Sequence, residues 1–198
     1  KVGDRANDSV RINAPALRAS VVGEGANLGF TQKARVEYAL AEGRINTDAI
    51  DNSAGVDISD HEVNLKILLT ALYKKNKVSD LQLFFNSLTE KVSQSILENN
   101  YKQTLCLSLE QIRSSTQLKT YLQCADQLEA SGFLDKDVES FMPDKEILSR
   151  QQQLLTRPEL AVIMAASKMQ LTQQILEHAD LFEHDFFKTF LITTDPRM

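Results

Sequence analysis

The spacing of hydrophobic residues changes character about a third of the way along the chain. Before that point, short apolar runs alternate with glycine-containing loops: Leu17–Val22 predicts one strand, and Arg44 to about Ile50 predicts a second. Between them, Thr31 is a typical N-cap for a helix from Gln32 to about Glu42, with Gly43 at its end. A strand, loop, helix and strand within about 35 residues form the minimum crossover unit of a parallel sheet. The pattern therefore predicts a piece of parallel α/β structure, incomplete because two strands alone do not make a stable sheet.

The rest of the chain has the spacing of amphipathic helices. Ser59-Asp60-His61-Glu62 has the form of a capping box and opens a predicted helix through about Lys77. Apolar positions three and four residues apart predict further helices. One is capped by Ser79, the next runs from about Tyr101 to Ala130 and is ended by Gly132, and two short helices are separated by Pro143. Another runs from a second capping box at Thr156–Glu159 through about Glu177, and the last from Asp180 to about Leu191.

The predicted fold class is therefore mainly α, a helical bundle preceded by a partial α/β (Rossmann-type) remnant with about two short parallel strands. Residues 1–58 form the predicted remnant and residues 59–198 the predicted helical domain. The distribution of glycine agrees with this division, because six of the 7 glycines precede residue 60 and only Gly132 follows. Glycine marks tight turns and close backbone approach, whereas its absence is typical of long helices.

Composition and charge narrow the classes of partner. The net charge is −5, and no basic block or tryptophan occurs, so we expect no nucleic acid partner. The longest apolar run, Leu160–Ala166, is far shorter than the roughly 18 residues of a membrane span, so we expect no membrane partner. Cys106 and Cys124 fit no metal or redox spacing, and we expect them to be reduced, buried thiols of a cytoplasmic protein.

The loop Gly23–Gly29 follows a predicted strand and precedes a predicted helix. Such a loop is typical of pyrophosphate binding in dinucleotide-binding domains, and Asp48 lies at about the right distance downstream to bind a ribose hydroxyl. However, its spacing is G-x-G-x-x-x-G, and Glu24 stands where a phosphate would come closest. Three interpretations stay open on this pattern: a phosphate cradle, a structural turn without a ligand, and a loop that faces another part of a cofactor.

A second candidate loop, Asp51–Ser59, leads directly into the first predicted capping box. In a parallel sheet both loops would leave the carboxyl ends of strands, where ligands of open α/β sheets bind. Ser59 then has two compatible interpretations. It can be a plain helix N-cap, worth about 1 kcal/mol, or it can also bind a substrate carboxylate at the positive helix N-terminus. Spacing alone favours the plain cap.

These loops resemble the end of the coenzyme domain in glutamate dehydrogenases, most closely the very large bacterial NAD-specific class. The resemblance is carried by Glu24-Gly25-Ala26-Asn27, by Thr31, by Asn52-Ser53-Ala54-Gly55-Val56 and by Ser59. It extends over VVGEGANLGFTQKARVEYAL and GRINTDAIDNSAGVDISDHEVN, and continues through Glu98–Tyr101 and LTRPELAVIMAASK (Leu155–Lys168). It therefore covers nearly the whole chain, and the first 65 residues are the most specific part.

The resemblance implies oxidative deamination of L-glutamate to 2-oxoglutarate and ammonia, with NAD as the hydride acceptor. The protein's share of this work is to hold the substrate α-carbon against the nicotinamide ring and to exclude water. Carried over by position, Asn27 and Asn52 would lie near the nicotinamide-ribose end of the coenzyme. Val56 and Ser59 would face the glutamate, with Ser59 binding a carboxylate.

The chain departs from the family pattern in two ways. Where the smaller glutamate dehydrogenases have Asn-Ala-Gly-Gly-Val, this chain has Ala54 in place of a glycine, which adds a Cβ near the expected ligand. The family's phosphate-binding glycine motif and its catalytic lysine and aspartate have no counterpart, so we assign no catalytic residue. His178 and His184 lack metal-ligand spacing, so we expect no metal site.

The chain is therefore expected to be an inactive C-terminal segment whose partners are the remainder of a large subunit and further copies in a homo-oligomer. Two alternatives stay open. In one, the helical half is an interaction or regulatory module without ligand binding. In the other, the chain is a free-standing helical protein whose glycine loops are only turns.

Overall fold

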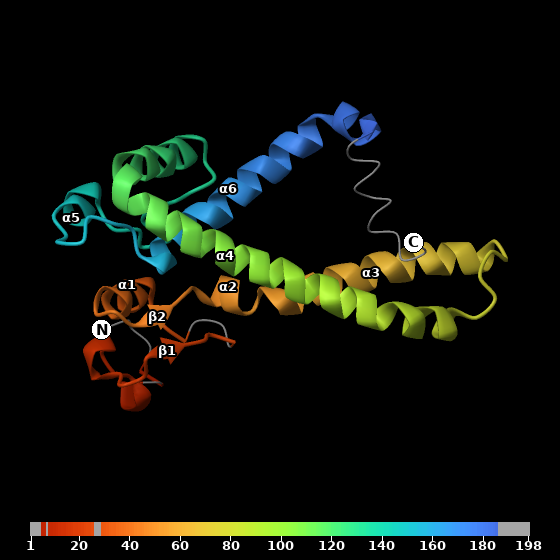
Figure 1. Ribbon diagram of the computed structural model, residues 1–198, viewed down its shortest axis with the longest axis horizontal. Coiled ribbons are helices and arrows are strands. Elements are labelled where there is room, and N and C mark those ends of the chain that lie inside the picture. The colour runs from red at the N-terminus through yellow and green to blue at the C-terminus, as the bar shows by residue number, and fades with distance from the viewer. Residues whose placement is uncertain (1–4, 7, 26–28, 186–198) are drawn as a thin grey trace. The chain divides into compact units, whose positions relative to one another are not determined.

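The computed structural model describes residues 5–6, 8–25 and 29–185. Within these ranges the chain is mainly helical with one two-stranded sheet, which confirms the predicted fold class (Figure 1). The strands are β1 (Val21–Val22) and β2 (Arg44–Ile45), and the helices are α1 (Gln32–Leu40), α2 (Asp48–Asp51), α3 (Ser53–Lys74), α4 (Leu81–Ala130), α5 (Asp144–Leu148) and α6 (Arg157–Glu177). Short 3-10 turns lie at Asp8–Val10, Ala14–Ala16 and Ala179–Glu183. None of the helices in the described ranges combines the length and apolar character needed to cross a membrane.

The chain divides into two compact units, each built from two separate stretches of sequence. The first unit comprises Lys1–Asp51 and Leu107–Ser167, and the second comprises Asn52–Cys106 and Lys168–Met198. The long helix α4 and helix α6 each contribute to both units. A domain boundary between residues 58 and 59 stays a prediction.

The sheet of the first unit is the predicted parallel pair, with Val21 opposite Arg44 and Val22 opposite Ile45. Helix α1 connects the strands and begins as predicted, because the Thr31 hydroxyl oxygen accepts a hydrogen bond from the Ala34 N–H at 3.2 Å. The second strand is shorter than predicted. The Thr47 carbonyl accepts from the N–H groups of Ile50 and Asp51, both at 3.1 Å, so the chain coils into α2 instead of continuing extended.

The turn between α1 and β2 depends on a close approach at Gly43. Its N–H donates to the carbonyl of Tyr38 at 3.0 Å, and a Cβ at this position would lie 2.3 Å from the buried Tyr38 ring. The residue with left-handed backbone is the preceding Glu42, with φ of 66°. Gly43 therefore ends this helix, as predicted, for reasons of space.

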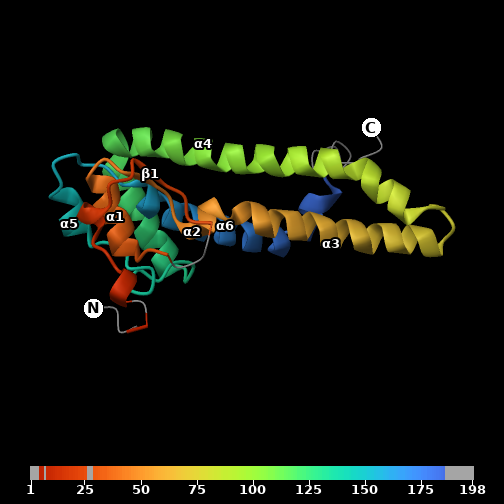
Figure 2. The ribbon, with the colours of Figure 1, turned by 90° about the horizontal axis from the view of Figure 1, so that it is seen from below.

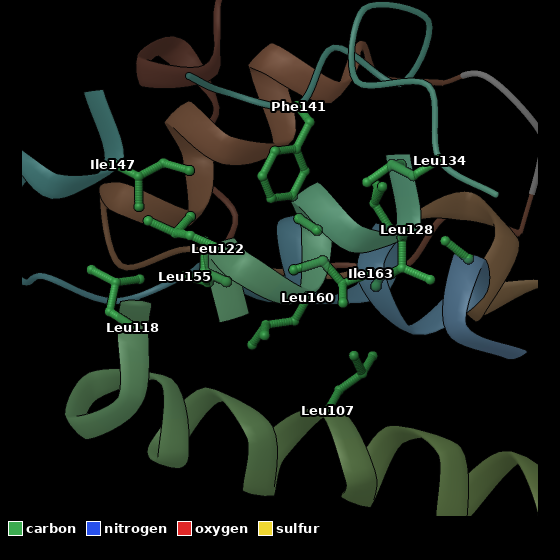
Figure 3. Close-up of a cluster of buried hydrophobic side chains, with 14 of the residues drawn as sticks. Leu107, Leu118, Leu122, Leu128, Leu134, Phe141, Ile147, Leu155, Leu160 and Ile163 are labelled. Atoms are coloured by element: carbon green, nitrogen blue, oxygen red, sulfur yellow. The ribbon is translucent and has the colours of Figure 1, made fainter. Parts of the chain in front are cut away.

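The main core of the first unit lies among the second half of α4, α5 and α6. It includes Leu107, Leu118, Leu122, Leu128, Leu134, Phe141, Ile147, Leu155, Leu160 and Ile163, whose side chains converge in Figure 3. Ile50 of α2 belongs to the same cluster. Helix α4 departs from helical geometry at Gln117 (φ −125°, ψ 26°) and ends at Ala130. Gly132, two residues on, has a φ of +79° and is the predicted stop. The start of α6 at the second predicted capping box and its end at Glu177 are also confirmed.

In the second unit, α3 and the first part of α4 lie side by side and run in opposite directions, as Figures 1 and 2 both show. The capping box predicted at Ser59 is wrong, because α3 already begins at Ser53. Ser59 lies inside the helix, where its hydroxyl donates to the Val56 carbonyl at 2.9 Å. A serine within a helix commonly satisfies its hydroxyl on a carbonyl of the preceding turn, so a Ser-x-x-Glu pattern does not by itself mark a helix start.

Further predictions fail in the described ranges. The helix predicted after Ser79 and the one predicted from about Tyr101 are one continuous helix, α4. Of the two short helices predicted on either side of Pro143, only α5 forms. Asp80, not Ser79, caps α4, since its Oδ1 accepts from the Leu83 N–H at 2.9 Å. The helix predicted from Asp180 is a 3-10 turn over Ala179–Glu183, and its expected continuation from residue 186 lies outside the described residues. Both cysteines are free thiols, but Cys106 is exposed instead of buried.

Candidate functional site

Polar residues gather where the two parallel strands end. Because the strands are parallel, their carboxyl ends lie at one edge of the sheet, and the chain leaves that edge at Gly23-Glu24 after β1 and at Asn46-Thr47 after β2. We call this edge, with the side chains that hydrogen-bond to it, the carboxyl edge. Its polar contacts fall into two connected groups.

The first group is centred on Glu24, which is 4% exposed. Its Oε2 accepts from Arg35 Nε at 2.6 Å, and its Oε1 accepts from Arg35 Nη2 at 3.0 Å and from the Phe30 N–H at 3.1 Å. The carboxylate thus joins the start of the glycine loop to its end and fastens both to α1. Glu24 serves the structure of its own loop, and its carboxylate is bound within the protein.

Asp48 completes this group. Its Oδ1 lies 3.2 Å from Arg35 Nη2, so the residue considered for a ribose hydroxyl is an ion-pair partner in the structure. Burial by itself lowers the pKa of the Arg35 guanidinium, but the hydrogen bond and charge of Glu24, with the charge of Asp48, outweigh it and raise that pKa. Arg35 therefore stays a cation, and its single positive charge pairs with both carboxylates and offsets the repulsion between them.

The second group runs from Asp51 to α6. Asp51 Oδ2 accepts from the Glu24 N–H at 2.9 Å, and its Oδ1 accepts from Asn46 Nδ2 at 2.8 Å. Asn46 Oδ1 in turn accepts from Arg157 Nε at 2.8 Å, while Arg157 Nη1 donates to Ser108 Oγ at 2.8 Å. Burial lowers the pKa of Arg157, and the Asp51 carboxylate offsets part of that effect.

The structure describes three of the four predicted site residues, and all three lie at or near the start of α3. Asn27 lies outside the described residues. Asn52 is half-buried and directly precedes α3, while Val56, 62% exposed, and the exposed Ser59 lie within the first two turns of that helix. Ser59 is therefore brought next to Val56, but it lies one turn inside α3 and not at its N-terminus. The binding roles of all four residues stay predictions.

Sequence reasoning missed the side-chain hydrogen bonds that hold the start of α3. Ser53 Oγ donates to Asn100 Oδ1 at 2.5 Å and accepts from Gln103 Nε2 at 3.0 Å, so the start of α3 is held by α4. This gives Asn100, which lies within the Glu98–Tyr101 part of the family resemblance, a structural role. Among the residues that the structure describes, no three His, Cys, Asp or Glu side chains are grouped to hold a metal ion.

A parallel strand pair joined by a crossover helix, with polar loops at its carboxyl edge, is typical of part of an open α/β domain. Comparison with known proteins gives the particular family. The family model described as "Bacterial NAD-glutamate dehydrogenase, catalytic domain" matches residues 1–110, and the chain belongs to this family. The resemblance seen in the sequence is thereby confirmed.

Curated relatives agree with this assignment. The chain is 46% identical over 180 residues to the NAD-specific glutamate dehydrogenase of Pseudomonas aeruginosa, covering 89% of this chain and 11% of that protein. It is 41% identical over 194 residues to the NAD-specific glutamate dehydrogenase of Mycobacterium tuberculosis, covering 96% of this chain and 12% of that protein. It is 40% identical over 180 residues to the protein of the same name from Halomonas elongata, covering 89% of this chain and 11% of that protein. The chain thus spans about a ninth of the length of these relatives. No solved structure matches the chain.

Proposed function

We propose that this chain is the segment of an NAD-dependent glutamate dehydrogenase that supplies part of the coenzyme-binding edge and part of the glutamate pocket. The observation that carries the proposal is the carboxyl edge itself. One set of hydrogen bonds, centred on Asp51 and Glu24, fastens the two segments that follow the parallel strands, within the stretch that matches the family's catalytic domain. Ligands of open α/β sheets bind at such an edge.

The proposed roles follow the family positions. Asn27 and Asn52 contact the nicotinamide-ribose end of NAD, which suits an amide because it offers both a donor and an acceptor to a hydroxyl. Val56 presents an exposed apolar surface to the carbon chain of glutamate. The Ser59 hydroxyl binds a glutamate carboxylate, for which it rotates away from the Val56 carbonyl that it contacts here.

The reaction is the oxidative deamination of L-glutamate to 2-oxoglutarate and ammonia, and NAD, when bound, accepts the hydride. The residues of this chain hold the coenzyme and the substrate and shield them from water. The residues for proton transfer and for pyrophosphate binding belong to the remainder of the subunit. By itself the 198-residue segment is inactive, and the assembled enzyme is a homo-oligomer.

Replacing Ser59 by alanine in the full-length subunit is expected to raise the KM for glutamate by about 10- to 100-fold, as for the loss of a hydrogen bond to a charged group. The KM for NAD should change little. Steady-state kinetics with each substrate varied in turn measure both. Ser87→Ala is a matched control, because Ser87 is exposed on α4 and its hydroxyl also donates to the carbonyl three residues earlier. An unchanged glutamate KM in Ser59→Ala would remove this residue from the proposed pocket.

The hypothesis of an interaction module has support of its own in the second unit. A groove of about 650 Å³ runs between α3 and α4, lined by apolar residues that include Ile58, Leu65, Phe85 and Val92. Leu97 and Tyr101 are exposed on α4, at 65% and 67%. Such faces are typical of surfaces that another element covers. This role is compatible with the enzymatic one and stays a hypothesis.

A further inference from the structure

The first turn of α6 makes hydrogen bonds to the segments around the carboxyl edge. Arg157 Nε donates to Asn46 Oδ1 at 2.8 Å, and Gln32 Nε2 at the start of α1 donates to the Pro158 carbonyl at 3.0 Å. Arg157 and Pro158 lie outside residues 1–110, the range that matches the catalytic-domain model. Residues beyond the matched range therefore contact the part of the chain that is proposed to bind the coenzyme.

The amide of Asn46 links the Arg157 guanidinium to the Asp51 carboxylate. A guanidinium can only donate hydrogen bonds and a carboxylate can only accept them, so a side chain that joins the two must do both. Asn46 has the required amide: its oxygen accepts from Arg157 and its nitrogen donates to Asp51 Oδ1 at 2.8 Å. Aspartate in its place would set two carboxylates against each other, and a hydrocarbon side chain would end the connection.

The connection reaches both segments that carry proposed coenzyme ligands. Asp51 is bonded directly to Asn52 in the chain, and its second oxygen holds the N–H of Glu24, three residues before Asn27. We propose that Arg157 is a positioning residue for coenzyme binding, which acts through Asn46 and Asp51 to hold the backbone at Glu24 and Asp51, close in sequence to the proposed NAD ligands. This inference rests on the proposed function and extends it to α6.

Arg157 is itself held firmly. Its Nη1 donates to Ser108 Oγ at 2.8 Å, and the residue is half-buried. The turn that carries it is fixed by Glu159, 1% exposed, whose Oε2 accepts from the Thr156 N–H at 2.9 Å. Arg150 binds both oxygens of the same carboxylate, at 2.8 and 2.7 Å. A positioning residue needs such support, because misplacement by about 1 Å at a binding site can cost two orders of magnitude in activity.

The test uses the full-length subunit with Arg157→Met, Asn46→Leu and the double variant. Each single variant is expected to raise the Kd for NAD by about tenfold or more, while the KM for glutamate changes by less than about twofold. The double variant should match the weaker-binding single variant, because two links in one series are not additive. Arg157→Lys keeps a donor for Asn46 but loses the fork that also reaches Ser108, so it should restore part of the affinity. NAD titration, steady-state kinetics and Tm are measured for each.

Arg113→Met is the matched control. Arg113 is exposed and pairs with Glu110 on the same helix, so its loss should leave NAD binding unchanged. A lowered Tm with an unchanged NAD Kd in Arg157→Met would show a purely structural role and overturn the proposal, as would additive effects in the double variant. A wild-type subunit that binds NAD but does not oxidise glutamate would contradict the proposed function, and the titrations would still test the positioning role.

Discussion

In the chain with Arg35 replaced by methionine, we expect the free energy of unfolding to fall by about 3 to 5 kcal/mol. The substitution leaves the buried carboxylate of Glu24 without its cation, with the Phe30 N–H as its remaining donor among the contacts described above. It also removes the cation with which Asp48 Oδ1 pairs at 3.2 Å. Removing one partner of a buried ion pair is costly because the desolvation of the other is no longer repaid.

Urea unfolding followed by circular dichroism measures this effect, and Arg113→Met is again the matched control. The Arg113–Glu110 pair is exposed, with 60% of the arginine side chain accessible, so its loss should cost no more than about 1 kcal/mol. Equal unfolding midpoints for Arg35→Met and Arg113→Met would mean that the buried pair does not hold the glycine loop.

The second large effect is expected for Glu159→Gln, again about 3 to 5 kcal/mol. Glu159 is the acceptor for Arg150 and for both the N–H and the hydroxyl of Thr156, so the glutamine amide must turn a donor toward another donor. The Arg150 side chain is 8% exposed and would keep an unpaired charge. The same unfolding experiment measures the loss.

Glu177→Gln is the control for this variant, because Glu177 is exposed at the other end of α6 and accepts only an amide hydrogen bond from Gln173 among the contacts described. Its unfolding midpoint should match that of the wild type. If Glu159→Gln were as stable as Glu177→Gln, the start of α6 would be fixed by its apolar packing alone, and Arg157 would lose the rigid support inferred for it.

Helix starts and ends could be predicted from the sequence where the residues that determine them are close together along the chain. The Thr31 cap, the stop at Gly132 and the box at Thr156–Glu159 each involve residues within three or four positions of one another, and all three are confirmed. The same kind of pattern at Ser59 was misleading. Whether a helix begins at a capping motif or passes through it depends on packing, here the hold of Asn100 and Gln103 on Ser53.

Only part of the carboxyl edge could be predicted from the sequence. Parallel pairing placed the two segments at one edge, and the family resemblance named the residues beside them. The side chains that join the segments could not be found this way, because Asn46 and Arg157 lie 111 positions apart. Glu24 was likewise considered as an obstacle to phosphate, since no local pattern shows that Arg35 and the Phe30 N–H bind its carboxylate.

The most direct test of the central claim is glutamate-dependent formation of NADH by the full-length subunit, with and without Asn52→Ala. We expect the wild-type subunit to reduce NAD with glutamate. The variant should raise the KM for NAD by about tenfold, the effect of about one lost hydrogen bond, with a nearly unchanged KM for glutamate. Absence of glutamate-dependent NADH formation in the wild-type subunit, or an Asn52→Ala variant with the wild-type KM for NAD, would contradict the assignment of this edge to the coenzyme.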